Sequence, residues 1–393
     1  MIRLYPHQEQ VLSLTKNRKR VGYYLDMGLG KTFLASEKAK ELGKPVLAIC
    51  QKSKIQDWQE HFKTHYDLPA TIINYDLIWR RKEYLTWKDF TLILDESSLI
   101  KHETTKRTKF ILNLRPANII LLSGTPTGGK YEELWTQCHL LGWNISKETF
   151  FNHYIVTEKI DVGGFLLTKV IGYKNVDRLK RKLREYGAVF MKTEEVFELP
   201  EQVEIITSVK ATKEYRQFKR ERYLTVDNAE LVGDTPLKEL LYLRQLCGQF
   251  NKNKISALKD LIDSTNDRLV IFYNFTAESE IIKTLTDRPI SYINGAGTDL
   301  KNYEDHSNSI TLVQYQAGSM GHNLQLSNII VYFTLPLSSD LFEQSKKRIH
   351  RIGQERSCFY YFLLTQKSIE EKILNVLRQR KDFTDALFRE RED

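Results

Sequence analysis

Residues 26–32 (Asp-Met-Gly-Leu-Gly-Lys-Thr) have the residue types that bind a triphosphate. Gly28 and Gly30 allow the backbone to turn successive N–H groups toward phosphate oxygens. Lys31 can reach the outer phosphates with its positive charge, and Thr32 can offer its hydroxyl to magnesium. The usual first glycine of such a loop is replaced by leucine. The pattern therefore predicts either a phosphate-binding loop or an ordinary tight turn.

Two further polar segments follow apolar runs and can complete this chemistry. Asp95 and Glu96 come directly after Phe90–Leu94. One such carboxylate can hold magnesium through its water shell, while the second orients and deprotonates an attacking water molecule. The alternative for this pair is a solvated strand end. The segment 123–126 (Ser-Gly-Thr-Pro) is either a glycine turn or a pair of hydroxyls that sense the phosphates.

Alternating strands and helices are needed to bring these segments together. We expect a helix over Phe33–Leu42, directly after the glycine-rich segment. The expected strands of the first half are Val21–Leu25, Val46–Gln51, Thr71–Ile78, Phe90–Leu94 and Asn118–Leu122. This alternation is typical of βαβ units around a parallel sheet. Open α/β sheets bind ligands at the carboxyl ends of their strands, which is where the polar segments lie.

The alternation of strands and helices begins again in the second half of the chain. The expected strands there are Leu269–Phe275, Ile290–Ile293, Ile310–Tyr315, Ile329–Leu335 and Phe359–Leu364. This half has no phosphate loop, which makes sense if its sheet closes over the nucleotide of the first. Between the two halves, Gly163-Gly164 predicts a hairpin. The basic run Val176–Tyr186 is either a solvated helix face or a surface that faces DNA.

Composition limits the class of protein. The chain has 393 residues, which favours two domains, and its formal net charge of +9 suits a polyanionic partner without requiring one. Its four cysteines form no CxxC pair, so neither a zinc site nor a redox pair is indicated. There is no signal peptide and no apolar run near eighteen residues. We therefore expect a soluble, intracellular protein that does not enter a membrane.

The order of the segments in the first half resembles the first motor lobe of superfamily 2 helicase-like ATPases, in particular the Swi/Snf-type branch. Tyr5-Pro6-His7-Gln8 resembles its adenine-reading motif, and residues 26–32 resemble its Glu-Met-Gly-Leu-Gly-Lys-Thr, which also lacks the first glycine. Leu47–Trp58 resembles motif Ia, a DNA-phosphate contact, and residues 74–76 (Asn-Tyr-Asp) match motif Ib. Ser98 departs from the family, which has histidine there.

The second half resembles the second lobe of the same family. Residues 348–354 (Arg-Ile-His-Arg-Ile-Gly-Gln) match motif VI at all but one position, and its two arginines act on the γ-phosphate held by the other lobe. At a spacing of three, Arg348 and Arg351 would share one face of a helix. Residues 317–324 resemble motif V, and 273–276 resemble motif IV, both of which face DNA. Ser368–Leu387 resembles the family's bracing helix.

The resemblance implies an α/β fold of two RecA-like lobes, each a parallel sheet flanked by helices, with helical protrusions between them. We expect the first lobe at 1–205 with an excursion at about 145–200, a helical protrusion and linker at 206–253, and the second lobe at 254–393. The implied catalytic residues are Lys31, Asp95, Glu96, Arg348 and Arg351. The implied ATP contacts are Gln8, Gly28, Leu29, Gly30, Lys31, Thr32 and Gln344, with Thr32 and Asp95 binding Mg²⁺. The implied nucleic-acid contacts are Gln51, Lys52, Trp58, Asn74, Tyr75, Asn274, Gly318 and Asn323.

The implied activity is ATP-driven translocation along double-stranded DNA. The contacts would be to the phosphate backbone, so binding would be independent of sequence and sensitive to salt. We expect a monomer in the cytoplasm of a bacterium or a phage-infected cell. Two alternatives stay open: a helicase of another superfamily 2 branch that separates DNA or RNA strands, and a nucleic-acid-binding scaffold without turnover.

Overall fold

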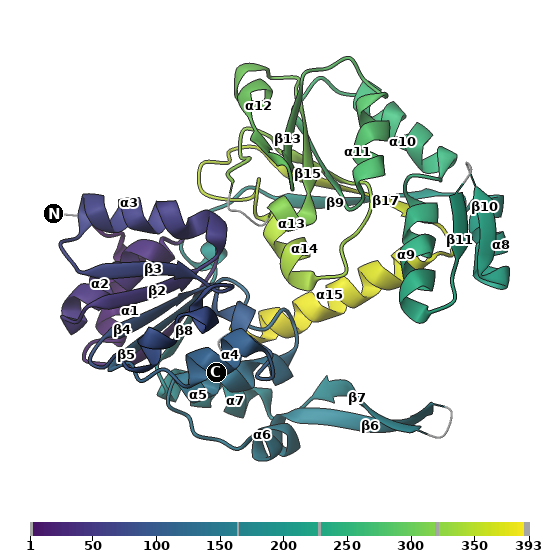
Figure 1. Cartoon of the computed structure of the whole chain (residues 1–393). Helices are drawn as coiled ribbons and strands as arrows, with labels where there is room; N and C mark the ends of the chain where they lie inside the picture. Colours follow the sequence, from purple (N-terminus) through teal and green to yellow (C-terminus); the bar gives the residue numbers. More distant parts are fainter. Residues whose placement is uncertain (1–2, 163–164, 227–228, 319–321, 389–393) are drawn as a thin grey trace. The chain divides into compact units, whose positions relative to one another are not determined.

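The computed structural model describes residues 3–162, 165–226, 229–318 and 322–388, which fall into two compact units (Figure 1). The first unit runs to Phe197 and also includes the C-terminal residues from Asp382, and the second unit is Glu198–Lys381. Part of the motif V-like segment (319–321) and the glycines of the predicted hairpin turn lie outside the described residues. In the described parts of the chain, no helix has the length and apolar character needed to span a membrane.

The first unit is built on a sheet of parallel strands in the order β3-β2-β4-β5-β1-β8. Its strands are β1 (Arg20–Leu25), β2 (Val46–Cys50), β3 (Ala70–Asn74), β4 (Thr91–Asp95), β5 (Asn118–Ser123) and β8 (Ala188–Met191). The five predicted strands are confirmed, and β8 was not predicted. Strand β3 ends at Asn74 and not at Ile78, because the Asn74 side chain accepts hydrogen bonds from the backbone N–H groups of residues 76 and 77.

Helices cover both faces of this sheet. They are α1 (Pro6–Leu14), α2 (Lys31–Leu42), α3 (Ile55–His65), α4 (Lys106–Leu112), α5 (Trp135–Leu140), α6 (Lys147–Tyr154) and α7 (Val176–Glu185). Because successive strand residues point to opposite faces, Tyr23 packs with the core under α1–α3, while Tyr24 packs with the core under α4–α7. The α/β architecture predicted for this half is confirmed.

A hairpin extends from the rest of the first unit (Figure 1). It consists of β6 (Ile155–Val162) and β7 (Phe165–Tyr173), which pair antiparallel as the sequence predicted. Leu166 and Leu167, on β7, are exposed.

The second unit has a larger sheet in the order β14-β13-β15-β12-β16-β17-β9, parallel except for β14. Its strands are β9 (Gln202–Val209), β12 (Leu269–Tyr273), β13 (Ile290–Asn294), β14 (Gly297–Asp299), β15 (Ile310–Gln314), β16 (Ile329–Tyr332) and β17 (Cys358–Thr365). The five predicted strands are present. The predicted first boundary, at residue 205, falls inside β9, whose pairing with β17 makes it the edge of this second sheet.

The sheet of the second unit also carries a core on each face. Its helices are α10 (Lys252–Asp263), α11 (Thr276–Lys283), α12 (Lys301–Asp305), α13 (Tyr315–Gly318), α14 (Ser339–Lys346) and α15 (Ile369–Phe388). One core includes Leu258 and Ile282 from α10 and α11, and the other includes Phe342 and Leu374 from α14 and α15.

Residues 206–253, predicted as a helical protrusion, contain strands as well as helices. The segment carries α8 (Lys213–Glu221), a hairpin of β10 (Tyr223–Val226) and β11 (Ala229–Val232), and α9 (Pro236–Cys247). These elements share a small apolar core of their own.

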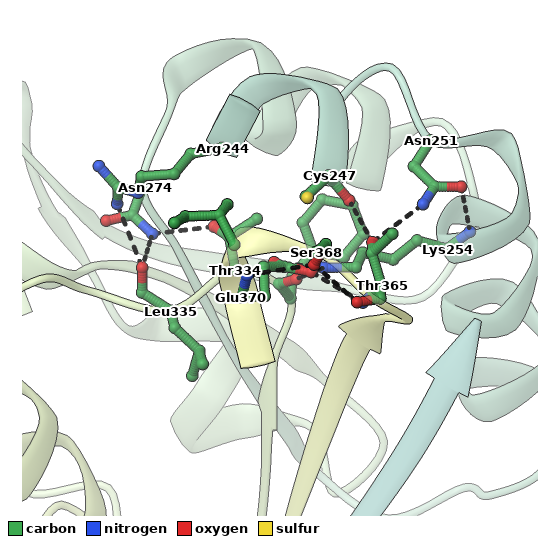
Figure 2. A network of polar contacts seen from close by, with 12 residues as sticks. Arg244, Cys247, Asn251, Lys254, Asn274, Thr334, Leu335, Thr365, Ser368 and Glu370 are labelled. Atoms are coloured by element: carbon green, nitrogen blue, oxygen red, sulfur yellow. Dashed lines mark hydrogen bonds and ion pairs between the residues drawn. The ribbon is translucent and has the colours of Figure 1, made fainter. Parts of the chain in front are cut away.

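A buried ion pair ties α10 to α15 at the carboxyl ends of β16 and β17 (Figure 2). The Lys254 ammonium donates to both carboxylate oxygens of Glu370, at 2.6 and 2.7 Å, and to the carbonyl of Phe333 at 2.9 Å. Glu370 also accepts the backbone N–H of Thr365 at 2.9 Å. The two charged side chains are 0% and 3% exposed, so each depends on the other for its compensation.

We expect Lys254→Met to lower the free energy of unfolding of the second unit by about 3–5 kcal/mol, because it leaves Glu370 buried without its cation. This loss is measured by urea unfolding that is monitored through hydrogen exchange of the backbone amides in β16 and β17. Lys259→Met is the matched control, since Lys259 lies on the same helix and pairs with Asp263 at the surface. An equal loss in the two variants would contradict a special contribution from the buried pair.

Candidate active site

The loop between β1 and α2 has the geometry predicted for a phosphate-binding loop. Gly28 has φ +91° and Gly30 has φ +72°, in the left-handed region that favours glycine. Lys31 is the first residue of α2, which runs for twelve residues. The N-terminus of this helix therefore presents backbone N–H groups and a partial positive charge at the end of β1.

Gln8, predicted to read adenine, lies against this loop. Its side-chain amide donates to the carbonyls of Leu29 and Gly30, both at 3.3 Å, and its side-chain oxygen accepts the backbone N–H of Tyr5 at 2.9 Å. A Cβ atom added to Gly30 would lie 2.1 Å from Nε2 of Gln8. The backbone angle therefore favours glycine at position 30, and an added Cβ would force the end of the Gln8 side chain to move.

The start of the loop is held in place by Thr193, which was not among the predicted site residues. The buried carboxylate of Asp26 accepts the backbone N–H of Thr193 at 3.2 Å, and the Thr193 hydroxyl donates to the carbonyl of Met27 at 3.4 Å. Strand β8, which pairs with β1, brings Thr193 to this place. Because 167 residues separate Thr193 from Asp26, no local pattern could have identified the contact.

Lys31 lies at the carboxyl ends of the strands, among the predicted catalytic groups. Its ammonium donates to the carbonyls of Leu25 at 2.7 Å and Asp26 at 3.0 Å. The ammonium also lies close to the segment after β5, since a Cβ atom added to Gly124 would be 3.7 Å from the Lys31 nitrogen. The positive charge of Lys31 also lowers the pKa of both Asp95 and Glu96. The structure thus brings Lys31 together with both predicted carboxylates.

Glu96 has strained backbone geometry and a well-oriented carboxylate. Its φ is +60°, in the left-handed region that a residue with a side chain seldom adopts. One carboxylate oxygen, Oε1, accepts hydrogen bonds from the hydroxyls of Ser123 at 2.7 Å and Ser98 at 3.0 Å. Ser98, where the resembling family has histidine, therefore contacts Glu96 directly.

Burial raises the pKa of both carboxyl groups in this corner. For Asp95, the opposing influences are first the indole hydrogen bond of Trp58 and then the charge of Lys31. For Glu96, Lys31 opposes most strongly, followed by Ser123. A carboxylate with a raised pKa is a stronger base, so Glu96 is suited to accept a proton from water.

A buried glutamine connects the segment after β4 with the segment after β5. The amide oxygen of Gln137 accepts the hydroxyl of Ser97 at 2.8 Å, and its nitrogen donates to the carbonyl of Pro126 at 2.7 Å. Gln137 is fully buried. No sequence pattern predicted this connection.

Three of the residues predicted to contact nucleic acid are buried. Trp58, Asn74 and Tyr75 are 2%, 4% and 3% exposed. The Trp58 indole donates to Asp95 Oδ2 at 2.8 Å, and the Tyr75 hydroxyl donates to the Asp95 carbonyl at 2.9 Å. Asn74 uses its side chain to end β3. In the structure, these side chains support the fold and Asp95, and contact of the three residues with nucleic acid stays a prediction.

The two predicted arginines of the second unit lie in a turn and not on one helical face. Helix α14 ends at Lys346, whose carbonyl accepts the Tyr360 hydroxyl at 3.1 Å. The Arg348 carbonyl accepts the backbone N–H of Leu324 at 3.0 Å. Helix α14 thus ends before the two arginines, which lie in the turn that follows.

Arg348 and Arg351 both contact the motif V-like segment. Arg348 is 1% exposed and donates from Nη1 to the carbonyl of His322 at 3.3 Å. Arg351 is partly buried, and its Nη1 donates to the side-chain oxygen of Asn323. The predicted residues Arg348, Arg351 and Asn323 are therefore brought together within the second unit.

Other residues of the motif VI-like segment hold it in place. The Gln354 amide donates to the carbonyls of Ser327 at 2.8 Å and Gln325 at 3.1 Å. His350 Nε2 donates to the carbonyl of Pro200 at 2.8 Å. Gln344, a predicted ATP contact, lies partly buried on α14.

The remaining predicted nucleic-acid contacts differ in their surroundings. The Asn274 amide donates to the Thr334 hydroxyl at 2.9 Å and to the Leu335 carbonyl at 3.0 Å, so it stabilises the strand ends (Figure 2). Gly318 is the last residue of α13. Gln51 and Lys52 follow β2, and Lys52 is exposed. Contact of these residues with nucleic acid stays a prediction.

Comparison with known proteins identifies two family domains along the chain. Residues 67–252 match the SNF2-related domain, and residues 253–353 match the helicase conserved C-terminal domain. A Bacillus subtilis protein named as an ATP-dependent helicase/translocase, YwqA, is 24% identical over 92% of this chain, which covers 46% of that protein. The chromatin structure-remodeling complex subunit snf21 of Schizosaccharomyces pombe is 24% identical over 89% of the chain, which covers 36% of that protein. The chain thus spans less than half the length of these two relatives.

A solved structure also resembles the chain. It is the Sulfolobus solfataricus SWI2/SNF2 ATPase core in complex with double-stranded DNA, with 21% identity and a TM-score of 0.46. The alignment covers 98% of this chain and 92% of that one.

We expect Gly30→Ala to destabilise the first unit more than Gly43→Ala does. Gly43 ends α2 with φ +64° and has no atom within 4 Å of an added Cβ, so its substitution adds only backbone strain of about 1–2 kcal/mol. Gly30→Ala adds the same strain and also a clash with Gln8. Urea unfolding of both variants measures the difference.

The clash can be isolated with a third variant. In a Gln8→Ala background, Gly30→Ala should cost no more than Gly43→Ala, because the obstructing amide is gone. Equal costs for the two single glycine variants would show that Gln8 does not occupy the space beside Gly30.

Proposed function

This chain belongs to the SNF2 (Swi/Snf-type) family of ATP-dependent, helicase-like proteins, and we propose that it is an ATP-driven motor that moves along double-stranded DNA. The observation that carries the proposal is the convergence of Lys31, Asp95 and Glu96 at the carboxyl end of the first sheet. Phosphoryl transfer to water needs backbone N–H groups that bind the phosphates, a cation such as the Lys31 ammonium, and two carboxylates.

In the proposed cycle, the loop from Gly28 to Thr32 binds the phosphates of ATP. Lys31 now donates to two backbone carbonyls, and it exchanges these for the outer phosphate oxygens when the nucleotide enters. Gln8 lies beside the loop, where its amide can recognise the adenine edge. A triphosphate supplies the negative charge that the N-terminus of α2 favours.

The residues at this site also fit a magnesium ion. Thr32 and Asp95 offer a hydroxyl and a carboxylate, and magnesium prefers such hard oxygen ligands together with phosphates and water. The carboxylate of Asp95 is already oriented by Trp58. When bound, the ion would neutralise charge on the β- and γ-phosphates.

We assign Glu96 the role of general base. The hydroxyls of Ser123 and Ser98 both donate to Oε1, which orients the second oxygen, Oε2, for a water molecule. The raised pKa of Glu96 favours proton transfer from that water to the carboxylate. Ser123 is the last residue of β5, so the state of Glu96 can be passed to the segment that follows this strand.

Arg348 and Arg351 complete the proposed chemistry from the second unit. Each guanidinium can stabilise the charge that develops on the transferring γ-phosphoryl group. Their contacts with residues 322–323 connect them to a segment that faces DNA in the family that the sequence resembles. Alternate engagement and release of the nucleotide by these arginines would convert hydrolysis into movement along DNA.

Double-stranded DNA is the proposed track. The net charge of +9 favours a polyanion, and the relative YwqA is named as a translocase. Contacts to the phosphate backbone do not depend on sequence and weaken as salt concentration rises.

We expect double-stranded DNA to stimulate ATP hydrolysis, and Glu96→Gln to reduce the stimulated rate by about 10²–10⁴-fold, the usual contribution of a general base. A phosphate-release assay with duplex DNA, single-stranded DNA and RNA measures both effects. Glu83→Gln, at an exposed carboxylate of the same unit, should leave the rate unchanged. Stimulation by RNA but not by duplex DNA would overturn the choice of track, and strand release in a fork-unwinding assay would favour a helicase.

We expect Arg351→Ala to lower the DNA-stimulated rate by about 10³-fold or more while nucleotide binding is preserved, because the arginine acts on the transition state. Rates are compared with the affinity for an ATP analogue measured by calorimetry. Arg356→Ala is the control, since Arg356 lies five residues on and pairs with Asp267 at the surface. An Arg351→Ala variant with a normal rate would remove this residue from the mechanism.

A further inference from the structure

Asp95 is held at two points by aromatic side chains from neighbouring elements. The Trp58 indole donates to the carboxylate oxygen Oδ2 at 2.8 Å, and the Tyr75 hydroxyl donates to the backbone carbonyl of the same residue at 2.9 Å. Both aromatic residues are buried. Neither the carboxylate nor the peptide group of Asp95 can therefore turn without breaking a buried hydrogen bond.

Packing keeps the indole of Trp58 in one orientation. Trp58 is 2% exposed and belongs to the core under α1–α3. Its ring stacks on Phe62 with centroids 5.6 Å apart and meets the edge of His61 at 6.0 Å. Aromatic contacts of this kind add to the area that is buried. The indole N–H is thus a fixed donor aimed at one oxygen of Asp95.

The same helix, α3, supports the other proposed magnesium ligand. The Ser36 hydroxyl donates to the carbonyl of Thr32 at 2.9 Å, which uses its only hydrogen. Its 3.0 Å contact with His61 Nε2 must then be a hydrogen bond donated by the imidazole. Burial and then the neighbouring His65 lower the pKa of His61 to about 4, so the imidazole is neutral with its hydrogen on Nε2 at pH 7.

We propose that Trp58 is a positioning residue that sets the orientation of the Asp95 carboxylate toward magnesium, with Tyr75 as its partner on the backbone. The inference rests on the proposed function and assigns a role within that same site. Engaging Oδ2 with the indole leaves the other oxygen to face the ion and its water shell. Groups that orient a metal ligand in this way typically contribute about 10–100-fold to metal affinity.

The test is the magnesium dependence of nucleotide binding, which does not require turnover. Calorimetry with ADP is performed in EDTA and across a magnesium titration. Trp58→Phe keeps a buried ring and removes the indole N–H. We expect this variant to bind ADP in EDTA with the affinity of the wild type. The magnesium concentration that gives half of the increase in ADP affinity should be about tenfold higher or more.

Two further variants separate positioning from general stability. Trp135→Phe is the matched control, because it also removes an indole hydrogen bond of a partly buried tryptophan in the first unit, the one to the Ile145 carbonyl at 2.9 Å. Its magnesium requirement should equal that of the wild type. Tyr75→Phe removes a single oxygen atom, and it should raise the requirement in the same direction as Trp58→Phe. If Trp58→Phe does not fold, Tyr75→Phe decides the question.

An independent signal comes from the indole itself. The chain has five tryptophans, so a ¹⁵N spectrum shows five indole N–H signals, and the one lost in Trp58→Phe belongs to Trp58. We expect this signal to shift when magnesium is added to the ADP-bound wild type, while the Trp135 signal stays in place.

The outcomes distinguish this inference from the proposed function. Wild-type binding that tightens with magnesium, together with unchanged requirements in Trp58→Phe and Tyr75→Phe, would overturn the positioning role alone. Wild-type protein whose ADP binding shows no response to magnesium would overturn the proposed site and the positioning role with it.

Discussion

The first unit depends on one constraint, which is the burial of two neighbouring carboxylates at the end of strand β4. Burial raises the pKa of Asp95 and Glu96, so each must be compensated by nearby donors and by the charge of Lys31. Those donors come from four places: the Trp58 indole on α3, Ser98 beside the pair, Ser123 at the end of β5 and Lys31 at the start of α2. The arrangement of the surrounding elements follows from supplying these contacts.

The second unit meets a similar constraint with different residues. Lys254 and Glu370 compensate each other in the core, and Arg348 donates to a backbone carbonyl while almost fully buried. Removing a buried ion from water costs several kcal/mol unless partners replace the water, so such groups stay in one position. In both units, therefore, the charged residues assigned to chemistry sit on frameworks that hold them rigidly. Lys31 donates hydrogen bonds to two backbone carbonyls, which a phosphate can replace.

Local sequence patterns predicted most of the strands, but they did not predict which side chains are exposed. The apolar runs identified ten strands of the two parallel sheets, because a strand buried on both faces is apolar throughout. They missed β8, β9 and β14, short or alternating strands at sheet edges. The burial of Trp58, Asn74 and Tyr75 was not predicted, because position at a strand end does not reveal which way a side chain points. The expected helical face for Arg348 and Arg351 was wrong because α14 ends at Lys346, and a spacing of three residues does not show how far a helix continues.

The sequence by itself determined the order of the chemical parts: the glycine-rich loop, the carboxylate pair, the segment after β5 and the two arginines. These signals are local, since a turn, a strand end or a charge depends on residues within a few positions. Only the tertiary structure decided which partners complete each part. Thr193 reaches Asp26 across 167 residues, Gln137 joins two strand ends, and Trp58 fixes Asp95 across 37. Such contacts depend on which strands are neighbours in the sheet, and strand order is set by packing of the whole unit, which no short segment records.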